Sequence, residues 1–221
     1  LVSGFQILMV SLFLQLFCAA VSAFCYQKLP KKQRMILQYG TVCSNAGFLG
    51  NPVAEGLYGS LGLLYASIYL IPQRIVMWSA GVSYFTESPD KKEVLKKVLR
   101  HPCIIAVEIG ILLMAAQYRL PLFLSKAVSS LGGCTTAITM LFIGSGLADA
   151  GIRHMVSKLT VSYCLIRLLF IPSAVLAGCL MFSIDPAAGG VAVVLAAMPA
   201  GSTTSILAAK YQGDETFAAQ C

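Results

Sequence analysis

Charged residues are scarce in this chain, and histidine is scarcer still. Charged side chains make up 11% of the 221 residues, whereas 57% are hydrophobic and the mean hydropathy is +0.79. The two histidines, His101 and His154, stand alone in predicted loops, so no metal site is expected. Several apolar runs exceed the roughly 18 residues that can cross a bilayer. We therefore expect an integral, multi-pass membrane protein whose main partner is the lipid bilayer.

Sequence motifs of enzymes are also missing. The chain has no GxxxxGK[ST] phosphate loop and no HExxH motif, and Gly144, Ser145 and Gly146 lack the spacing of an intramembrane serine protease. The eight cysteines include no CxxC pair and fall mostly in apolar segments, as small buried hydrophobic residues do. We therefore expect no enzyme activity, no catalytic residues and no cofactor.

Hydropathy predicts seven membrane segments. The segments are 1–26, 36–60, 62–85, 103–118, 127–148, 159–183 and 187–209. The loops after the first, third, fifth and seventh segments carry twelve lysines and arginines, whereas the loops on the other side carry only Arg119 and Lys126. The positive-inside rule therefore places the basic loops in the cytoplasm. The net charge of +7 is then a topology signal, and no nucleic-acid partner is expected.

The second segment contains residues that interrupt a helix. GFLGNPVAEG (47–56) places two glycines, an asparagine and a proline near mid-span. Proline removes a backbone donor, and unpaired backbone groups are costly in hydrocarbon, so such a break survives only where protein or a watery cavity satisfies it. One proline alone would be weak evidence, because kinked helices are common.

The seventh segment contains a matching interruption. AAMPAGSTTSILAAKYQGD (196–214) places Pro199, Gly201 and four hydroxyl residues near mid-span. By the charge rule, the two interrupted segments run in opposite directions, as in an inverted repeat with a binding site between discontinuous helices. The expected fold class is all-α and polytopic, with an inverted five-plus-five helix repeat and two crossed discontinuous helices.

The repeat also predicts the organisation of the chain. The first repeat covers 1–85 with its broken helix at 36–60, and a cytoplasmic loop covers 86–102. The second repeat covers 103–221, with a broken helix at 187–209 and a truncated last helix from about 214. Matching the two halves indicates a fragment that lacks about two N-terminal helices and one C-terminal helix.

Four stretches resemble the auxin efflux carrier family. NAGFLGNPVAEGLYG (45–59) is similar to the first crossover of its bacterial permeases and plant carriers, with Asn51 where an apolar residue commonly precedes the proline. MPAGSTTSILAAKYQGDETFAAQ (198–220) resembles the second crossover and the start of the last helix. IPQRIVMWSAGVS (71–83) and LRHPCIIAVEIGILL (99–113) look like flanking helices of bacterial members.

The resemblance implies a secondary transporter of small organic anions in the bacterial inner membrane. The bacterial branch includes malate and malonate permeases, the plant branch carries auxin, and the fold is related to that of bile-acid sodium symporters. A sodium-coupled symporter of bile-acid type is the first alternative. Such a symporter would be expected to have acidic and amide ligands at both crossovers, whereas the second crossover here has only hydroxyl residues. A non-transporting membrane sensor on the same fold is the second alternative, and a homodimer is compatible with either.

The two interruptions together predict a site for an anion. Unwinding near Gly50 to Pro52 and near Pro199 to Gly201 would aim the positive ends of half-helices at the centre, and neutral donors could hold a carboxylate there. Helix packing is the alternative role at each position, because small and hydroxyl residues are common at membrane helix interfaces. The expected substrate-binding residues are Asn45, Gly50, Asn51, Pro52, Arg74, Pro199, Gly201, Ser202, Thr203 and Thr204.

Ionisable residues inside the spans are expected to face protein or water. A charge facing lipid at the bilayer centre costs at least about 2.5 kcal/mol. Arg74 could attract the anion or pair with a carboxylate such as Glu108, whereas Arg167 and Glu108 are expected to have structural roles. Glu55 could stabilise the first turn of its half-helix or carry a coupled proton.

Overall fold

The computed structural model describes residues 2–85, 105–106, 109–110, 112–113, 116–148 and 157–221. Its named elements are helical, and three of them are π-helical segments (η) that continue directly into α-helices. In chain order they are α1 (Val2–Cys25), α2 (Lys31–Val42), η1 (Ala46–Gly50), α3 (Asn51–Val76), η2 (Met77–Gly81), α6 (Leu122–Ala148), α7 (Lys158–Cys164), η4 (Leu165–Phe170), α8 (Ile171–Met181), α9 (Pro186–Ala196), α10 (Thr203–Lys210) and α11 (Glu215–Gln220).

Helix α1 packs against the rest of the molecule along one stripe that mixes aliphatic side chains with small and polar ones. The buried positions recur every three or four residues, which is the helical period. Ser11 donates a hydrogen bond of 2.6 Å to the carbonyl of Tyr69 and so joins α1 to α3. The remaining surface of α1 exposes large apolar side chains, including Phe5, Phe13 and Phe24, as expected for a helix that faces lipid.

Gly59 divides α3 into two helical parts. Its φ of 63° and ψ of −151° are accessible to glycine and strained for other residues. After this turn the chain runs back along itself, since a Cβ on Gly62 would meet the carbonyl of Ala54 and a Cβ on Gly47 would lie 2.9 Å from Nη2 of Arg74. The boundary between the predicted segments 36–60 and 62–85 therefore coincides with a reversal of the chain.

The C-terminal helices begin at residues that cap them. Asp185 accepts hydrogen bonds from the amides of Ala187 and Ala188 at the start of α9 (3.1 and 3.0 Å), and Asp214 accepts one from Phe217 at the start of α11 (2.9 Å). Such caps satisfy amides that have no acceptor within their own helix. Between α9 and α10 the helix is interrupted over 197–202, within the segment predicted to be broken.

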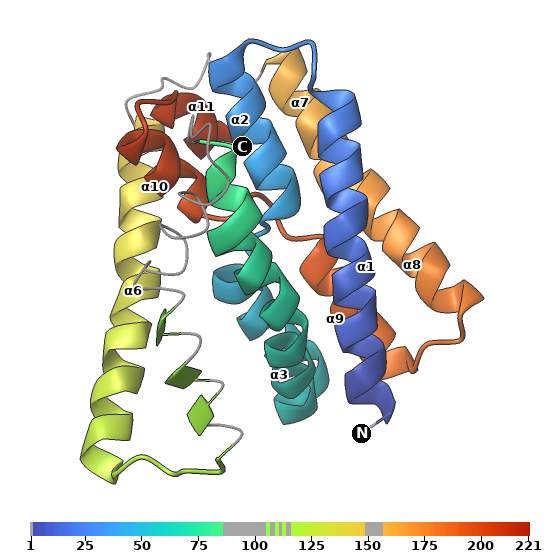
Figure 1. Cartoon of the computed structure of the whole chain (residues 1–221), viewed down its shortest axis with the longest axis vertical. Coiled ribbons are helices and arrows are strands. Elements are labelled where there is room, and N and C mark those ends of the chain that lie inside the picture. The colour runs from blue at the N-terminus through green and yellow to red at the C-terminus, as the bar shows by residue number, and fades with distance from the viewer. Residues whose placement is uncertain (1, 86–104, 107–108, 111, 114–115, 149–156) are drawn as a thin grey trace.

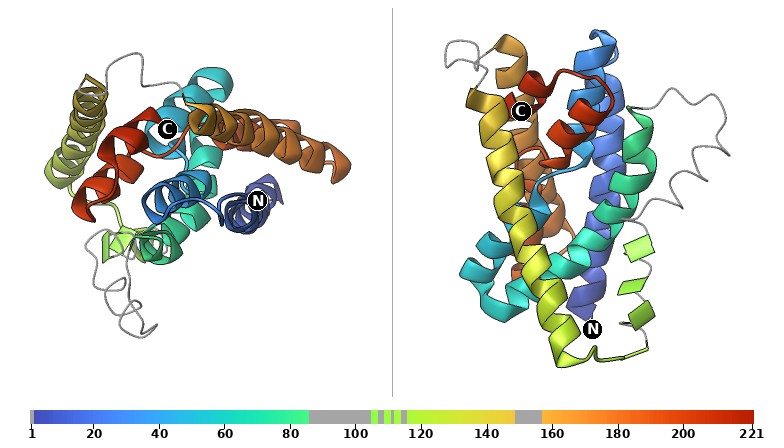
Figure 2. Two further views of the ribbon diagram at one scale, coloured as in Figure 1. Left: turned by 90° about the horizontal axis from the view of Figure 1, so that it is seen from above. Right: turned by 90° about the vertical axis from the view of Figure 1, so that its left-hand side faces the viewer.

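The helices lie side by side, and the two linkers between α2 and η1 and between α9 and α10 pass through the middle of the bundle (Figures 1 and 2). The α1–α2 connection, the start of α7 and the end of α10 lie at one end of the molecule (Figure 1). The sequence of these three regions includes Lys28, Lys31, Lys158 and Lys210. Basic residues from distant parts of the chain are thus gathered at one end.

Among the described residues, three helical stretches are long and apolar enough to cross a membrane. They are Val2–Cys25, Ala46–Gly81 and Lys158–Met181. The model thus bears out the all-helical class, and the inverted repeat and the missing helices stay predictions. The loop 86–102 and most of the predicted segment 103–118, with Glu108, lie outside the described residues.

Candidate functional site

The two helix interruptions contact each other through their backbones. Ser44 and Ala200 form an isolated antiparallel bridge, in which the amide of Asn45 donates to the carbonyl of Pro199 and the amide of Gly201 donates to the carbonyl of Cys43 (both 2.8 Å). We call the two paired segments, 43–45 and 197–202, the crossover. The pairing satisfies backbone groups that the interrupted helices leave without partners, as the membrane interior requires.

The first interruption lies earlier in the chain than the sequence predicted. Helical structure resumes at Ala46 and passes through Gly50 into α3, so the predicted unwinding at Gly50 to Pro52 is wrong. Pro52 occupies one of the first two positions of α3, where proline is tolerated. The unwound residues are instead 43–45, whose backbone groups pair with Gln73 and with the second linker.

Gln73 clamps the first interruption from the returning part of α3. Its side chain is 1% exposed, and Nε2 donates to the carbonyl of Ser44 at 2.7 Å. The Ser44 hydroxyl also lies 3.5 Å from the carbonyl of Leu195, at the end of α9. Gln73 is not among the predicted site residues, although an amide in an apolar span next to Arg74 is a usable signal.

Two predicted site glycines allow the linkers to approach closely. A Cβ on Gly201 would lie 2.9 Å from the carbonyl oxygen of Cys43, and one on Gly50 would lie 2.5 Å from Cδ2 of Leu195. Both distances are shorter than real Cβ contacts. A larger residue at position 201 would therefore push the two linkers apart, whereas one at position 50 would displace the Leu195 side chain.

Four predicted site residues, in the crossover or on the helices that follow its two segments, have a buried polar atom without a hydrogen-bond partner among the described residues. These atoms are Asn45 Oδ1, Asn51 Oδ1, Ser202 Oγ and Thr204 Oγ1. A buried polar atom without a partner costs about 1–3 kcal/mol, so each of these atoms requires a partner such as a water molecule or a ligand. The hydroxyl of Tyr163, also buried and unpartnered, belongs to the same region, since it would lie 2.7 Å from a Cβ on Gly40 next to Ala200.

Thr203 and Arg74 differ from these four because each is held by a neighbour. The hydroxyl of Tyr39, on α2, donates to Oγ1 of Thr203 at 3.0 Å, which ties α2 to the start of α10. Arg74 is half-buried, and its guanidinium lies over Gly47 at the start of the first resumed helix. Glu108, the predicted partner of Arg74, lies outside the described residues.

The remaining predicted residues lie at the edge of the crossover or beyond it. Pro199 is half-buried and supplies the carbonyl that pairs with Asn45. Pro52 and Glu55 have exposed side chains on α3. Glu55 does not lie in the first turn of α3, which contains no acidic residue, so its predicted role as a first-turn acid is wrong. The resumed helix begins at Ala46, about two turns before Glu55.

Arg167 reaches the crossover from the π-helical segment η4. Its side chain is 2% exposed, Nε donates to the carbonyl of Met198 at 3.1 Å and Nη1 donates to the carbonyl of Thr41 at 3.3 Å. The predicted structural role of Arg167 is consistent with these bonds, which join both interrupted helices. Its position against the linkers was not predicted, because a π-helical turn cannot be located from hydropathy.

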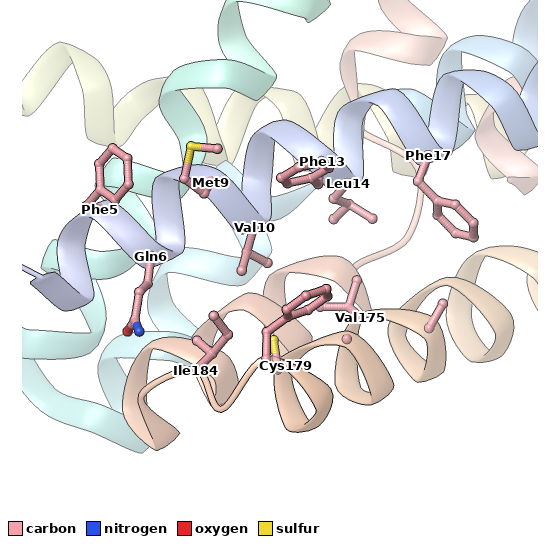
Figure 3. Close-up of a pocket in the computed structure, with 13 residues that line it drawn as sticks. Phe5, Gln6, Met9, Val10, Phe13, Leu14, Phe17, Val175, Cys179 and Ile184 are labelled. Atoms are coloured by element: carbon pink, nitrogen blue, oxygen red, sulfur yellow. The ribbon is translucent and has the colours of Figure 1, made fainter.

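A separate apolar groove of about 510 Å³ lies between α1 and α8 (Figure 3). Its lining includes Phe5, Phe13 and Phe17 of α1 and Val175 of α8. Gln6 adds a polar amide side chain to this lining. No charged residue lines the groove, so it offers nothing to hold a small anion.

The crossover offers both kinds of helix end to a ligand. The starts of η1 and α10 present the partly positive ends of helices, while α2 and α9 end there with partly negative carbonyl groups. Together with the unpartnered hydroxyls of Ser202 and Thr204, the helix starts can hold an anion. The carbonyl ends can hold a cation, and Arg167 contacts them.

Comparison with known proteins identifies the family of the chain. Residues 2–221 match the model of the family described as membrane transport protein. The chain is 23% identical over 180 residues to an uncharacterised transporter of Methanocaldococcus jannaschii, covering 79% of this chain and 58% of that protein. It is 25% identical over 179 residues to an uncharacterised transporter of Methanothermobacter thermautotrophicus, covering 80% and 58% respectively. The matched region thus spans little more than half the length of these curated relatives. The chain belongs to the membrane transport protein family, the auxin efflux carrier family, whose members are membrane transporters and not enzymes.

Proposed function

We propose that the protein is a secondary active transporter of small organic anions, chiefly carboxylates, with its substrate site at the crossover. The observation that supports this proposal most is the pair of buried hydroxyl groups of Ser202 and Thr204 at the start of α10, which have no hydrogen-bond partner among the described residues. A carboxylate could accept hydrogen bonds from these hydroxyls, from the side-chain NH2 groups of Asn45 and Asn51 and from the helix starts. Asn45, Asn51, Ser202 and Thr204 would contact the substrate directly.

Alternating access would follow from movement of other helices against the crossover. In transporters with broken helices, the site stays near the midplane while one helix group rocks past the other. We place the basic end of the molecule, with Lys28 and Lys158, in the cytoplasm of a bacterial cell, since positive loops stay inside. Glu55 remains a candidate for proton coupling on this account.

The experiment is uptake of labelled malate, malonate and an aromatic monocarboxylate into proteoliposomes that hold the complete protein. Proton and sodium gradients are imposed separately, with Asn51→Ala and Ser202→Ala in parallel and Ser67→Ala, on the exposed surface, as the matched control. Loss of a hydrogen bond to a charged ligand should lower kcat/KM by about 10-fold or more in the first two variants. Uptake of organic cations with no uptake of carboxylates would overturn the proposal.

A further inference from the structure

Arg167 carries a buried charge at the point where both interrupted helices stop. Thr41 is the penultimate residue of α2, and Met198 lies two residues beyond the end of α9. The Arg167 side chain donates to both of their carbonyls, and Nη1 also lies 3.9 Å from Sγ of Cys18 on α1. The guanidinium therefore joins the carboxyl ends of the first halves of both broken helices.

The electrostatics of this position favour a cation. Carbonyls in the last turn of a helix lack intrahelical donors, and the helix end carries about half a negative charge. Two such ends converge on Arg167. Among the residues that the structure describes, no carboxylate pairs with the Arg167 side chain, so its contacts are carbonyl oxygens and one sulfur. The positive charge is solvated by helix ends and is not cancelled by an acid.

Carbonyl groups at the ends of broken helices are also the ligands that hold sodium ions in coupled transporters. We propose that Arg167 is a built-in cation that takes the place of a coupling sodium ion between the carboxyl ends of α2 and α9. The fixed charge holds the two half-helices together in every step, so anion transport requires no sodium. This inference rests on the proposed function of the crossover. It assigns anion transport that is not coupled to sodium, and so opposes the alternative of a sodium-dependent symporter.

The same arrangement explains how a substrate anion is accommodated. The Met198 carbonyl that accepts from Arg167 is adjacent in the chain to Pro199, whose carbonyl accepts from Asn45. The guanidinium thus lies beside the unpartnered polar groups of the crossover. Arg167 covers the negative helix ends and leaves the positive ends, at η1 and α10, to the anion.

The test measures sodium binding separately from transport. The complete protein and the variants Arg167→Ala, Arg167→Gln and Arg167→Lys are purified, and the Tm of each is measured in NaCl and in choline chloride at equal ionic strength. Wild type and Arg167→Lys should show the same Tm in both salts. Arg167→Ala and Arg167→Gln should gain about 4 °C or more from sodium well above its dissociation constant, because the ion then binds the vacated carbonyls.

Two results would overturn the built-in cation. One is a saturable sodium-dependent rise of Tm in the wild type, and the other is a folded neutral variant that gains nothing from sodium. The neutral variants could fold poorly. In that case sodium during purification should restore their yield and choline should not. Equal yields in the two salts would count against the inference. If the Tm values follow the predicted pattern but the wild type takes up no carboxylate, the proposed function is refuted and the built-in cation is not.

Discussion

Hydrogen bonding divides the hydroxyl residues at the start of α10 into two kinds. Thr203 accepts a hydrogen bond from Tyr39 and so links two helices, whereas the hydroxyls of Ser202 and Thr204 are buried without a partner in the described part of the chain. The first kind stabilises the fold, and the second kind is available to a ligand. Neighbouring residues with the same chemistry should therefore behave differently when they are replaced.

We expect Ser202→Ala and Thr203→Ala to separate binding from stability. Removing the Thr203 hydroxyl deletes a bond and should lower the free energy of unfolding by about 1 kcal/mol. Removing the Ser202 hydroxyl deletes no bond within the protein, so stability should be unchanged or slightly higher while anion uptake falls. Urea or thermal unfolding in detergent, beside uptake of labelled malonate, measures both effects. Equal losses of stability in the two variants would contradict this division.

Gln73 should be one of the most sensitive polar positions outside the predicted site. Its replacement in Gln73→Leu leaves the carbonyl of Ser44 without its 2.7 Å donor, at a cost of about 1–3 kcal/mol in the free energy of unfolding. Gln38→Leu is the matched control, because the bond that Gln38 donates to the carbonyl of Ser22 is long, at 3.5 Å. Equilibrium unfolding compares the two, and a Gln38→Leu loss as large as that of Gln73→Leu would argue against the clamp.

At the scale of the helices, two glycines have different surroundings. Gly201 meets a backbone carbonyl where the linkers cross, while Gly56 on α3 has open space around the position of a Cβ. A glycine in a close backbone contact and a glycine on an exposed helix surface are indistinguishable in a single sequence. The structure therefore predicts opposite consequences for the same substitution.

Gly201→Ala should destabilise the protein and reduce transport, because the added methyl group would lie 2.9 Å from the carbonyl oxygen of Cys43. Overpacking of this kind costs about 1–3 kcal/mol. Gly56→Ala should be neutral or should stabilise α3 by up to about 1 kcal/mol, because alanine favours helix. Thermal unfolding of the two variants provides the comparison. A Gly201→Ala variant as stable as Gly56→Ala would mean that the linkers are not held in contact.

The sequence predicts that two helices are interrupted, but it does not give the exact residues at which they unwind. Pro199 and Gly201 lie inside the second linker as predicted. In the first broken helix, proline and glycine lie after the interruption, because backbone pairing with the second linker selects 43–45 for unwinding. Hydropathy also located the reversal near Gly59, but it carries no information on tertiary partners. The contacts of Gln73 and Arg167 therefore depend on the fold.

For the whole molecule, the central feature is a separation of charge at the crossing of two broken helices. Arg167 lies against the carbonyl ends of α2 and α9, and neutral polar groups lie near the starts of η1 and α10. On our account this separation turns a helical membrane protein into an anion carrier. The apolar groove between α1 and α8 has no comparable chemistry, because no charged residue lines it (Figure 3).

The most direct test of the crossover as the anion site is protection of a reporter thiol. Ser202→Cys is made in the complete protein without other reactive cysteines, and its alkylation by N-ethylmaleimide is followed with and without a carboxylate that the protein transports. Gln27→Cys, on an exposed connection, is the control. Our account predicts that the carboxylate slows alkylation of Ser202→Cys and leaves that of Gln27→Cys unchanged. An unchanged rate for Ser202→Cys at saturating carboxylate would contradict it.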